Sequence, residues 1–234
     1  MMNKDTAALL VCAGNATRMG GIHKILHPLG NTTVLHLALQ SICACADIAC
    51  AVVICREQDI AAFRQSIAEI EPALPVPVTV TAGGATRQQS VRNGFAVIPA
   101  DIALVAIHDG ARPLILPADA ERVIAAARET GAASLGVPVK DTVKVVREGI
   151  ICDTPPRAEL YLTQTPQVFR RSLYADAMLL AAEQGKDYTD DCQLVEALGN
   201  AVTMVTGDYS NLKLTTPEDF AIAEALLSRR TGGC

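Results

Sequence analysis

Residues 7–24 read AALLVCAGNATRMGGIHK, and this stretch decides the fold. Its first six residues, Ala7–Cys12, form a continuous apolar run, which is typical of a strand buried in a parallel sheet. A turn rich in small residues follows at once, and small side chains allow the backbone to approach a ligand closely. The stretch therefore predicts a strand that ends in a ligand-binding loop, as in doubly wound α/β folds.

The same alternation continues along the rest of the chain. Apolar runs alternate with segments of helical spacing, which predicts an α/β fold with a Rossmann-like, doubly wound and mostly parallel sheet. We expect one domain over residues 1–234, because this length suits a single medium-sized core. The expected strands are residues 7–12, 51–55, 76–81, 103–108 and 133–137, and the expected helices are residues 34–46, 59–70, 87–97, 117–130 and 217–228.

One pair of segments departs from this alternation. Asp141–Arg147 and Ile150–Thr154 have the pattern of a β-hairpin that turns at Glu148 and Gly149. A two-stranded hairpin is only marginally stable alone in water, so it must rest on another surface. We therefore expect residues 139–164 to form a protruding arm that contacts a second subunit.

The composition excludes several classes of function. The chain has 25 acidic and 20 basic residues, a formal net charge of −5, which is the wrong balance for a nucleic-acid partner. No apolar run is long enough to span a bilayer, so we expect no membrane partner. The polar start, Met1–Thr6, leads directly into the first strand, and we expect no signal peptide and a cytoplasmic location.

The eight cysteines do not follow a zinc-binding pattern. Four of them cluster at a helix end that runs into a strand, without the C-x-x-C spacing of a metal site. Reduced thiols in a cytosolic protein explain them better. The four are Cys43, Cys45, Cys50 and Cys55.

The loop after the first strand combines small residues with fixed positive charge. Backbone N–H groups around Ala13 and Gly14 can form an anion-binding concavity, and Arg18 and Lys24 lie beside it. These features describe a cradle for a triphosphate. The loop matches neither the P-loop nor the dinucleotide fingerprint, since Ala16 replaces a required glycine in the latter. An ordinary strand-to-helix loop with two solvated basic residues explains this loop alone equally well.

Three later segments are each consistent with a binding site. Asp109 ends an apolar strand and could hold a Mg²⁺ ion that is bound to phosphate oxygens, and Arg112 could bind a second anion. Alternatively, Asp109 caps a backbone N–H in a turn and Arg112 is solvated. Gly83 and Gly84 permit close approach to a planar base, and Ser90 offers a hydrogen bond; a glycine turn that starts a helix is the simpler reading. Lys213 lies late in the chain on an expected strand, and taken alone it is best interpreted as an exposed surface lysine.

The order and spacing of these motifs resemble one known family. The chain shows a strand followed by A-G-x-x-x-R-M, then G-G-x-x-R-x-x-S-V, H-D-x-A-R-P, T-P-Q and N-x-K-x-T-x-P-E-D. This arrangement resembles the 2-C-methyl-D-erythritol 4-phosphate cytidylyltransferase family over about residues 8–227. The chain departs from the family pattern at four places in its loops: Val11, Ala16, Ala85 and a short spacer before Lys24.

The resemblance implies a role for each candidate residue. The fold would be of the nucleotide-diphospho-sugar transferase type, and the enzyme would join CTP to the polyol-phosphate with release of pyrophosphate. Mg²⁺ or another divalent cation would be the cofactor, and the arm would cross to a second subunit in a homodimer. Arg18, Lys24 and Lys213 would be catalytic; Ala13, Gly14, Gly83, Gly84, Ser90 and Asp109 would bind the nucleotide; Asp109, Arg112, Thr142, Arg157, Thr189 and Lys213 would bind the acceptor; and Asp109 would bind the metal.

Two other functions remain open at this level. A sibling cytidylyltransferase for ribitol 5-phosphate would share the CTP loop and differ around the arm, although Ala111 favours the methylerythritol enzyme. A non-catalytic nucleotide-binding regulator on the same fold is a second alternative, and the retained charged residues argue against it.

Overall fold

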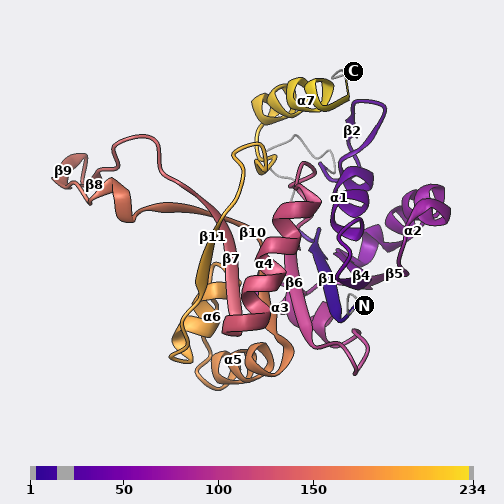
Figure 1. Cartoon of the computed structure of the whole chain (residues 1–234), viewed down its shortest axis with the longest axis horizontal. Coiled ribbons are helices and arrows are strands. Elements are labelled where there is room, and N and C mark those ends of the chain that lie inside the picture. Colours follow the sequence, from indigo (N-terminus) through magenta and orange to yellow (C-terminus); the bar gives the residue numbers. More distant parts are fainter. Residues whose placement is uncertain (1–3, 15–23, 232–234) are drawn as a thin grey trace.

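Within the described residues, seven strands form one central sheet in the order β11-β7-β10-β6-β1-β4-β5 (Figure 1). The structure is a computed structural model that describes residues 4–14 and 24–231. β10 is antiparallel to both of its neighbours, and every other pair is parallel. The expected mostly parallel α/β sheet is therefore confirmed. The strands are β1 (Thr6–Val11), β4 (Ile48–Cys55), β5 (Val78–Ala82), β6 (Leu104–Asp109), β7 (Ala132–Pro138), β10 (Tyr161–Arg170) and β11 (Thr203–Thr206).

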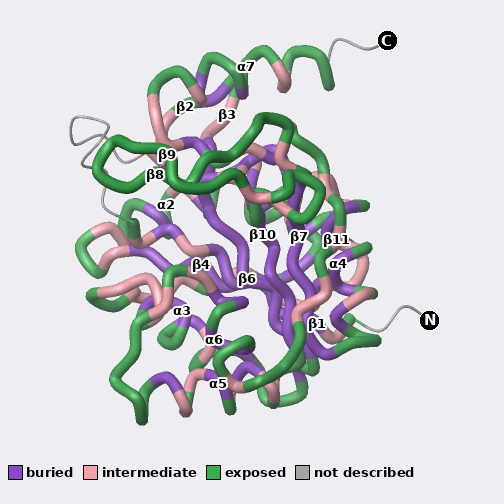
Figure 2. Tube along the Cα trace, turned by 90° about the vertical axis from the view of Figure 1, so that its left-hand side faces the viewer, coloured by how far each residue is buried: buried purple, intermediate pink, exposed green. Residues whose placement is uncertain are grey.

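Helices cover both faces of the sheet, so the doubly wound arrangement is also confirmed. Successive residues of β1 point to opposite faces: Leu10 packs into the core beneath α1, α2 and α4, and Leu9 packs into the core beneath α3, α5 and α6. The strands are the most buried part of the chain (Figure 2). The bounds are α1 (Val34–Cys43), α2 (Ile60–Ile70), α3 (Arg87–Phe95), α4 (Pro117–Thr130), α5 (Arg171–Glu183) and α6 (Asp191–Ala197).

Most boundaries shift by a few residues from those expected. The first helix ends at Cys43 rather than at residue 46, because residues 44–47 turn the chain into β4. The last helix, α7 (Pro217–Thr231), runs three residues beyond the expected end. A short antiparallel pair, β2 (Pro28–Leu29) and β3 (Thr32–Thr33), precedes α1 and has no counterpart in the sequence prediction. Three short 3₁₀ helices complete the described elements: Glu57–Asp59, Glu71–Ala73 and Arg157–Glu159.

The order of the strands places a crevice beside β1. From β1 the chain winds outward through β4 and β5, and it then returns to β6 on the other side of β1. The loops after β1 and β6 therefore leave the sheet in opposite directions. Ligands of such sheets bind at the carboxyl ends of the strands at this switch point.

A hairpin arm is present and stands away from the sheet, but it is shorter than expected, because Tyr161–Arg170 forms β10 and pairs with β7 from Tyr161 onward (Figure 1). β8 (Val145–Arg147) pairs with β9 (Ile150–Asp153), and the turn at Glu148 and Gly149 has φ of 51° and 80°. Two positive φ values in a two-residue turn match the twist of a tight hairpin. Every residue from 140 to 154 is exposed (Figure 2).

The part of the chain that the structure describes contains no helix that is both long and apolar enough to cross a membrane. Its seven cysteines are free thiols, and Cys43 and Cys55 lie at the ends of α1 and β4 as expected.

Candidate active site

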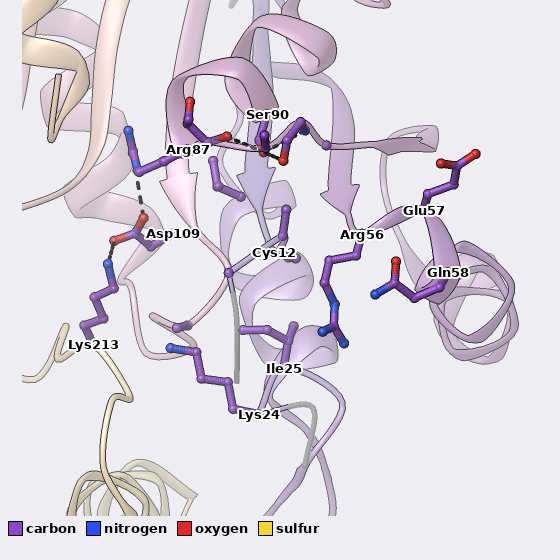
Figure 3. Close-up of a pocket in the computed structure, with 18 residues that line it drawn as sticks. Cys12, Lys24, Ile25, Arg56, Glu57, Gln58, Arg87, Ser90, Asp109 and Lys213 are labelled. Atoms are coloured by element: carbon purple, nitrogen blue, oxygen red, sulfur yellow. Dashed lines mark hydrogen bonds and ion pairs between the residues drawn. The ribbon is translucent and has the colours of Figure 1, made fainter. Parts of the chain in front are cut away.

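A cavity of about 610 Å³ lies where β1, β4, β5 and β6 end (Figure 3). This volume is within the range of roughly 300–1,000 Å³ that is usual for small-molecule sites. The cavity lies at the switch point of the sheet, where the strand order predicts a ligand. Among the residues expected at the site, it is lined by Ala13, Gly14, Lys24, Gly83, Gly84, Ser90, Asp109 and Lys213. Arg18 lies outside the described residues.

Asp109, the last residue of β6, is surrounded by three cationic side chains, of which Figure 3 shows Arg87 and Lys213. Its Oδ2 is 2.9 Å from Lys213 Nζ and 3.6 Å from Arg112 Nε, and its Oδ1 is 3.8 Å from Arg87 Nη2. Its side chain is 11% exposed. The three cations come from three separate parts of the chain, so the carboxylate joins these parts at the floor of the cavity.

The surrounding charges keep Asp109 ionised. Burial alone would raise its pKa, but Lys213 and then Arg87 outweigh burial and lower the pKa to about 2. The carboxylate is therefore anionic throughout the physiological pH range. Its charge offsets that of the cations, which can then lie close together without a ligand.

His108 fixes the backbone beneath Asp109. Its Nε2 is 3.1 Å from the carbonyl oxygen of Arg112, which can only accept, so Nε2 carries the proton. Its Nδ1 then accepts from the Thr165 hydroxyl at 3.0 Å, and this hydroxyl in turn accepts from the Asp109 N–H at 3.0 Å. Burial lowers the pKa of His108 to about 4, so the ring is neutral and serves as a brace rather than as an acid or base.

Lys24 and Lys213 line the same cavity although 189 positions separate them in the chain. The link between them is Leu214, whose N–H donates to the Ala111 carbonyl at 2.8 Å and whose carbonyl accepts from Lys24 Nζ at 3.1 Å. The sequence placed Lys213 on a strand, and this was wrong. Residues 211–215 are irregular: the Leu214 N–H donates to the Ala111 carbonyl and the Thr215 N–H donates to the Asp219 carboxylate in α7, so neither N–H takes part in a strand ladder.

The loop that contains Gly83 and Gly84, here called the glycine loop, is held by the side chain of Ser90 in α3. Ser90 Oγ accepts from the Gly84 N–H at 3.0 Å and donates to the Thr86 carbonyl at 2.8 Å. A Cβ at Gly83 would come within 2.7 Å of Ser90 Oγ and 2.8 Å of Ala13 Cβ, so the two cavity loops approach each other too closely for any larger residue. The Ser90 side chain therefore shapes the loop, and its contact with a base stays a prediction.

Arg112 is oriented differently from the sequence interpretation. Its Nη1 donates to the Asn211 carbonyl at 2.7 Å, its Nε faces Asp109, and it is absent from the cavity lining. Burial lowers the pKa of Arg112, and the neighbouring Asp109 opposes that shift. In this structure Arg112 supports the segment that carries Lys213, and its role toward an acceptor stays a prediction.

Three further expected residues lie outside the cavity and are exposed. Thr189, between α5 and α6, donates from its hydroxyl to Gln193 Oε1 at 3.1 Å. Arg157 donates from Nη1 to the Lys140 carbonyl at 2.8 Å at the base of the arm, and Thr142 lies on the arm itself. The structure does not bring these residues to the cavity within one chain.

Sequence reasoning gave no role to Arg87, the first residue of α3. Its Nη1 is 2.6 Å from Asp191 Oδ2, so the guanidinium joins Asp191 to Asp109 across the cavity wall. Burial would lower its pKa, but Asp191 and Asp109 raise it well above its ordinary value. The only signal in the sequence was an arginine three residues after a pair of glycines. That signal indicates a role only once the structure shows its two acidic partners.

The described residues do not offer a ready-made metal site. They contain no group of three or more His, Cys, Asp or Glu side chains placed to hold an ion. Asp109 already faces three cations, and a divalent ion at its carboxylate would be repelled by them. The geometry therefore does not support Asp109 as a metal ligand on its own.

Comparison with known proteins decides the family. The family model described as 2-C-methyl-D-erythritol 4-phosphate cytidylyltransferase matches residues 6–229. The chain belongs to this family. A cytidylyltransferase of this name from Syntrophotalea carbinolica is 44% identical over 221 residues, which is 94% of each chain. Another of the same name, from Desulforamulus reducens, is 51% identical over 158 residues, covering 67% of this chain and 68% of the relative.

The cytidylyltransferase fold is shared as well. The crystal structure of a 4-diphosphocytidyl-2C-methyl-D-erythritol synthase from Anaerococcus prevotii matches with a TM-score of 0.84 at 29% identity, over 96% of both chains. The resemblance drawn from the sequence motifs is therefore confirmed.

The environment of Asp109 predicts a specific dependence of stability on pH. Its pKa falls from an ordinary 3.8 to about 2 on folding, so the ionised form stabilises the folded state by about 2 kcal/mol at neutral pH. This contribution is complete above about pH 5, is about half lost by pH 3, and is gone below pH 2. Urea unfolding of the parent and of Asp109→Asn at pH 6 and pH 3 measures it: the difference in unfolding free energy should shrink by about 1 kcal/mol. A difference that stays constant with pH would contradict the ion-pair network.

Proposed function

We propose that this protein transfers the cytidylyl group of CTP to 2-C-methyl-D-erythritol 4-phosphate, with release of pyrophosphate, in isoprenoid precursor synthesis by the non-mevalonate route. The observation that supports this most strongly is the shared cavity of Lys24, Lys213 and Asp109 in a chain of the cytidylyltransferase family. An acidic protein with a cationic cavity is suited to a small anionic substrate rather than to a polyanion.

The chemistry requires charge stabilisation more than proton transfer. A phosphate oxygen of the acceptor attacks the α-phosphorus of CTP, the new P–O bond forms, and the bond to the β-phosphate oxygen breaks, so pyrophosphate carries the electron pair away. A phosphomonoester has its second pKa near about 6 and is largely ionised at neutral pH, so no general base is needed. Catalysis then depends on positioning and on cations placed where negative charge develops.

The side chains of the cavity suit this demand. Lys213 is held by Asp109 and Lys24 by the Leu214 carbonyl, so both ammonium groups are oriented before substrate arrives. No covalent intermediate with a protein thiol is needed, and burial keeps Cys12 protonated by raising its pKa well above the ordinary value. The lysines would supply charge, and the enzyme would contribute no nucleophile of its own.

We assign the remaining roles as follows. Arg18 would act with the two lysines on the triphosphate, Asp109 would contact the ribose, and a divalent cation such as Mg²⁺ would accompany CTP on its phosphate oxygens. The backbone around Ala13 and Gly14 would hold the triphosphate, and Gly83, Gly84 and Ser90 would surround the cytosine. The acceptor would be bound by Asp109, Arg112, Thr142, Arg157, Thr189 and Lys213.

The acceptor site would be completed by a second copy of the chain. The large apolar side chains that the arm exposes include Val146, Ile150 and Ile151, at 53%, 69% and 60%, which is costly for a hairpin in water. Thr142 and Arg157 lie on this arm and do not line the cavity of their own subunit. A homodimer that covers the arm would bury these side chains and bring both residues to the partner's site. We also propose a cytoplasmic location, which the free thiols suit.

The other functions considered are less well supported. A ribitol 5-phosphate cytidylyltransferase would share the nucleotide site, but the family match and the relatives favour the methylerythritol enzyme. A non-catalytic regulator would not need both Lys24 and Lys213 in the lining of one cavity.

Pyrophosphate release tests the function directly. We expect release with CTP and 2-C-methyl-D-erythritol 4-phosphate, and at least about 100-fold lower kcat/KM with ribitol 5-phosphate or with ATP, because the site is complementary to one base and one acceptor. A preference for ribitol 5-phosphate would identify the sibling activity, and no release with any pair would support the regulator.

The two lysines should be essential for turnover. Lys24→Ala or Lys213→Ala is expected to lower kcat by about 100- to 1,000-fold, because each removes a preorganised charge from the transition state. The exposed Lys4→Ala is the matched control and should behave as the parent. Circular dichroism verifies folding, and full turnover in both cavity variants would remove them from the catalytic role.

The arm should determine the oligomeric state. Ile150→Lys with Ile151→Lys places two charges on its apolar surface and is expected to shift the protein from dimer to monomer in sedimentation velocity, with loss of acceptor binding. Ile222→Lys, at an equally apolar exposed position on α7, is the control. Identical sedimentation of arm variant and parent would exclude dimerisation through the arm.

A further inference from the structure

The first turn of α3 holds a distant segment of the chain, residues 186–191, which we call the acceptor-side segment. This segment connects α5 to α6 and carries Thr189. Thr86 Oγ1 donates to Asp187 Oδ1 at 3.2 Å, and Arg87 Nη1 reaches Asp191 Oδ2 at 2.6 Å. Contacts at both ends of the segment thus come from consecutive residues at the start of one helix.

Gln88 makes the central contact, with both ends of its side-chain amide. Its Nε2 donates to the Lys186 carbonyl at 3.1 Å, and its Oε1 accepts from the Tyr188 N–H at 3.0 Å. The planar amide therefore pairs with the backbone on either side of Asp187, much as a neighbouring strand would. Lys186, Asp187 and Thr189 are exposed, whereas Gln167 of β10 holds the other end of the segment, at Asp190 and Asp191. The backbone before Thr189 therefore depends most on Gln88.

The same helix turn is tied to the glycine loop of the cavity. Thr86 caps α3 by accepting from the Gln89 N–H at 3.2 Å, and Ser90 bonds back to Gly84. The loop proposed for the base and the segment proposed for the acceptor are consequently attached to one rigid turn. Displacement of the segment relative to the glycine loop would require both hydrogen bonds of Gln88 to break.

We propose that Gln88 is a positioning residue for the acceptor. It does not line the cavity and acts through the backbone of Tyr188, the residue that precedes Thr189. This inference rests on the proposed function, in which Thr189 contacts the acceptor phosphate. Loss of Gln88 should therefore weaken acceptor binding more than CTP binding, because the glycine loop keeps its own brace through Ser90.

The experiment combines kinetics with amide hydrogen exchange. Gln88→Ala is expected to raise the KM for 2-C-methyl-D-erythritol 4-phosphate about tenfold, with the KM for CTP within about twofold, since two hydrogen bonds that orient the segment are lost. The amide of Tyr188 should exchange at least about tenfold faster. Gln88→Glu can still accept from Tyr188 but cannot donate to Lys186, so it should keep part of the protection while the acceptor KM rises.

The matched control is Gln65→Ala, which removes the same side chain from an exposed position of α2 and should change neither readout. Unchanged exchange at Tyr188 in Gln88→Ala would overturn the proposed contact. Faster exchange with an unchanged acceptor KM would overturn the positioning role and leave a purely structural brace. Absence of turnover in the parent would reject the proposed function instead, and exchange at Tyr188 would still decide whether Gln88 holds the segment.

Discussion

The carboxylate of Asp109 is the interaction on which the site depends. It brings Lys213 and Arg87, from distant parts of the chain, to the end of one central strand, where Arg112 also contacts it. Such a concentration of positive charge would repel itself in the absence of a compensating anion. A buried carboxylate that stays ionised thus allows a cavity to remain cationic while empty, ready for an anionic substrate.

Much of the fold could be predicted from the sequence. The apolar run at Ala7–Cys12 and the β–α alternation give the doubly wound sheet, and Glu148 with Gly149 gives the hairpin, since these patterns are local. Strands β10 and β11, the small β2–β3 pair and helices α5 and α6 were not predicted. The pairing of these strands depends on which strand lies next to them in space, and the chain around them carries no local signal for that neighbour.

Part of the cavity lining could be predicted from the sequence, but the orientation of the side chains could not. Motif order singled out Lys24, Asp109 and Lys213, and the structure brings all three to one cavity. The sequence did not show that Arg112 turns toward the Asn211 carbonyl rather than into the cavity, because a guanidinium three residues from an aspartate can face either way. Nor could it identify Arg87, whose partners lie far away along the chain.

The link through Leu214 has a consequence for how the protein matures. All seven strands of the sheet are complete by Thr206, before the ribosome adds Lys213. A nascent chain that has reached Thr206 therefore still lacks one of the two lysines, as well as the carbonyl that orients the other. It also lacks Leu214 and Phe220, whose buried side chains belong to the core, so one C-terminal segment completes both the charge of the cavity and the packing of the scaffold.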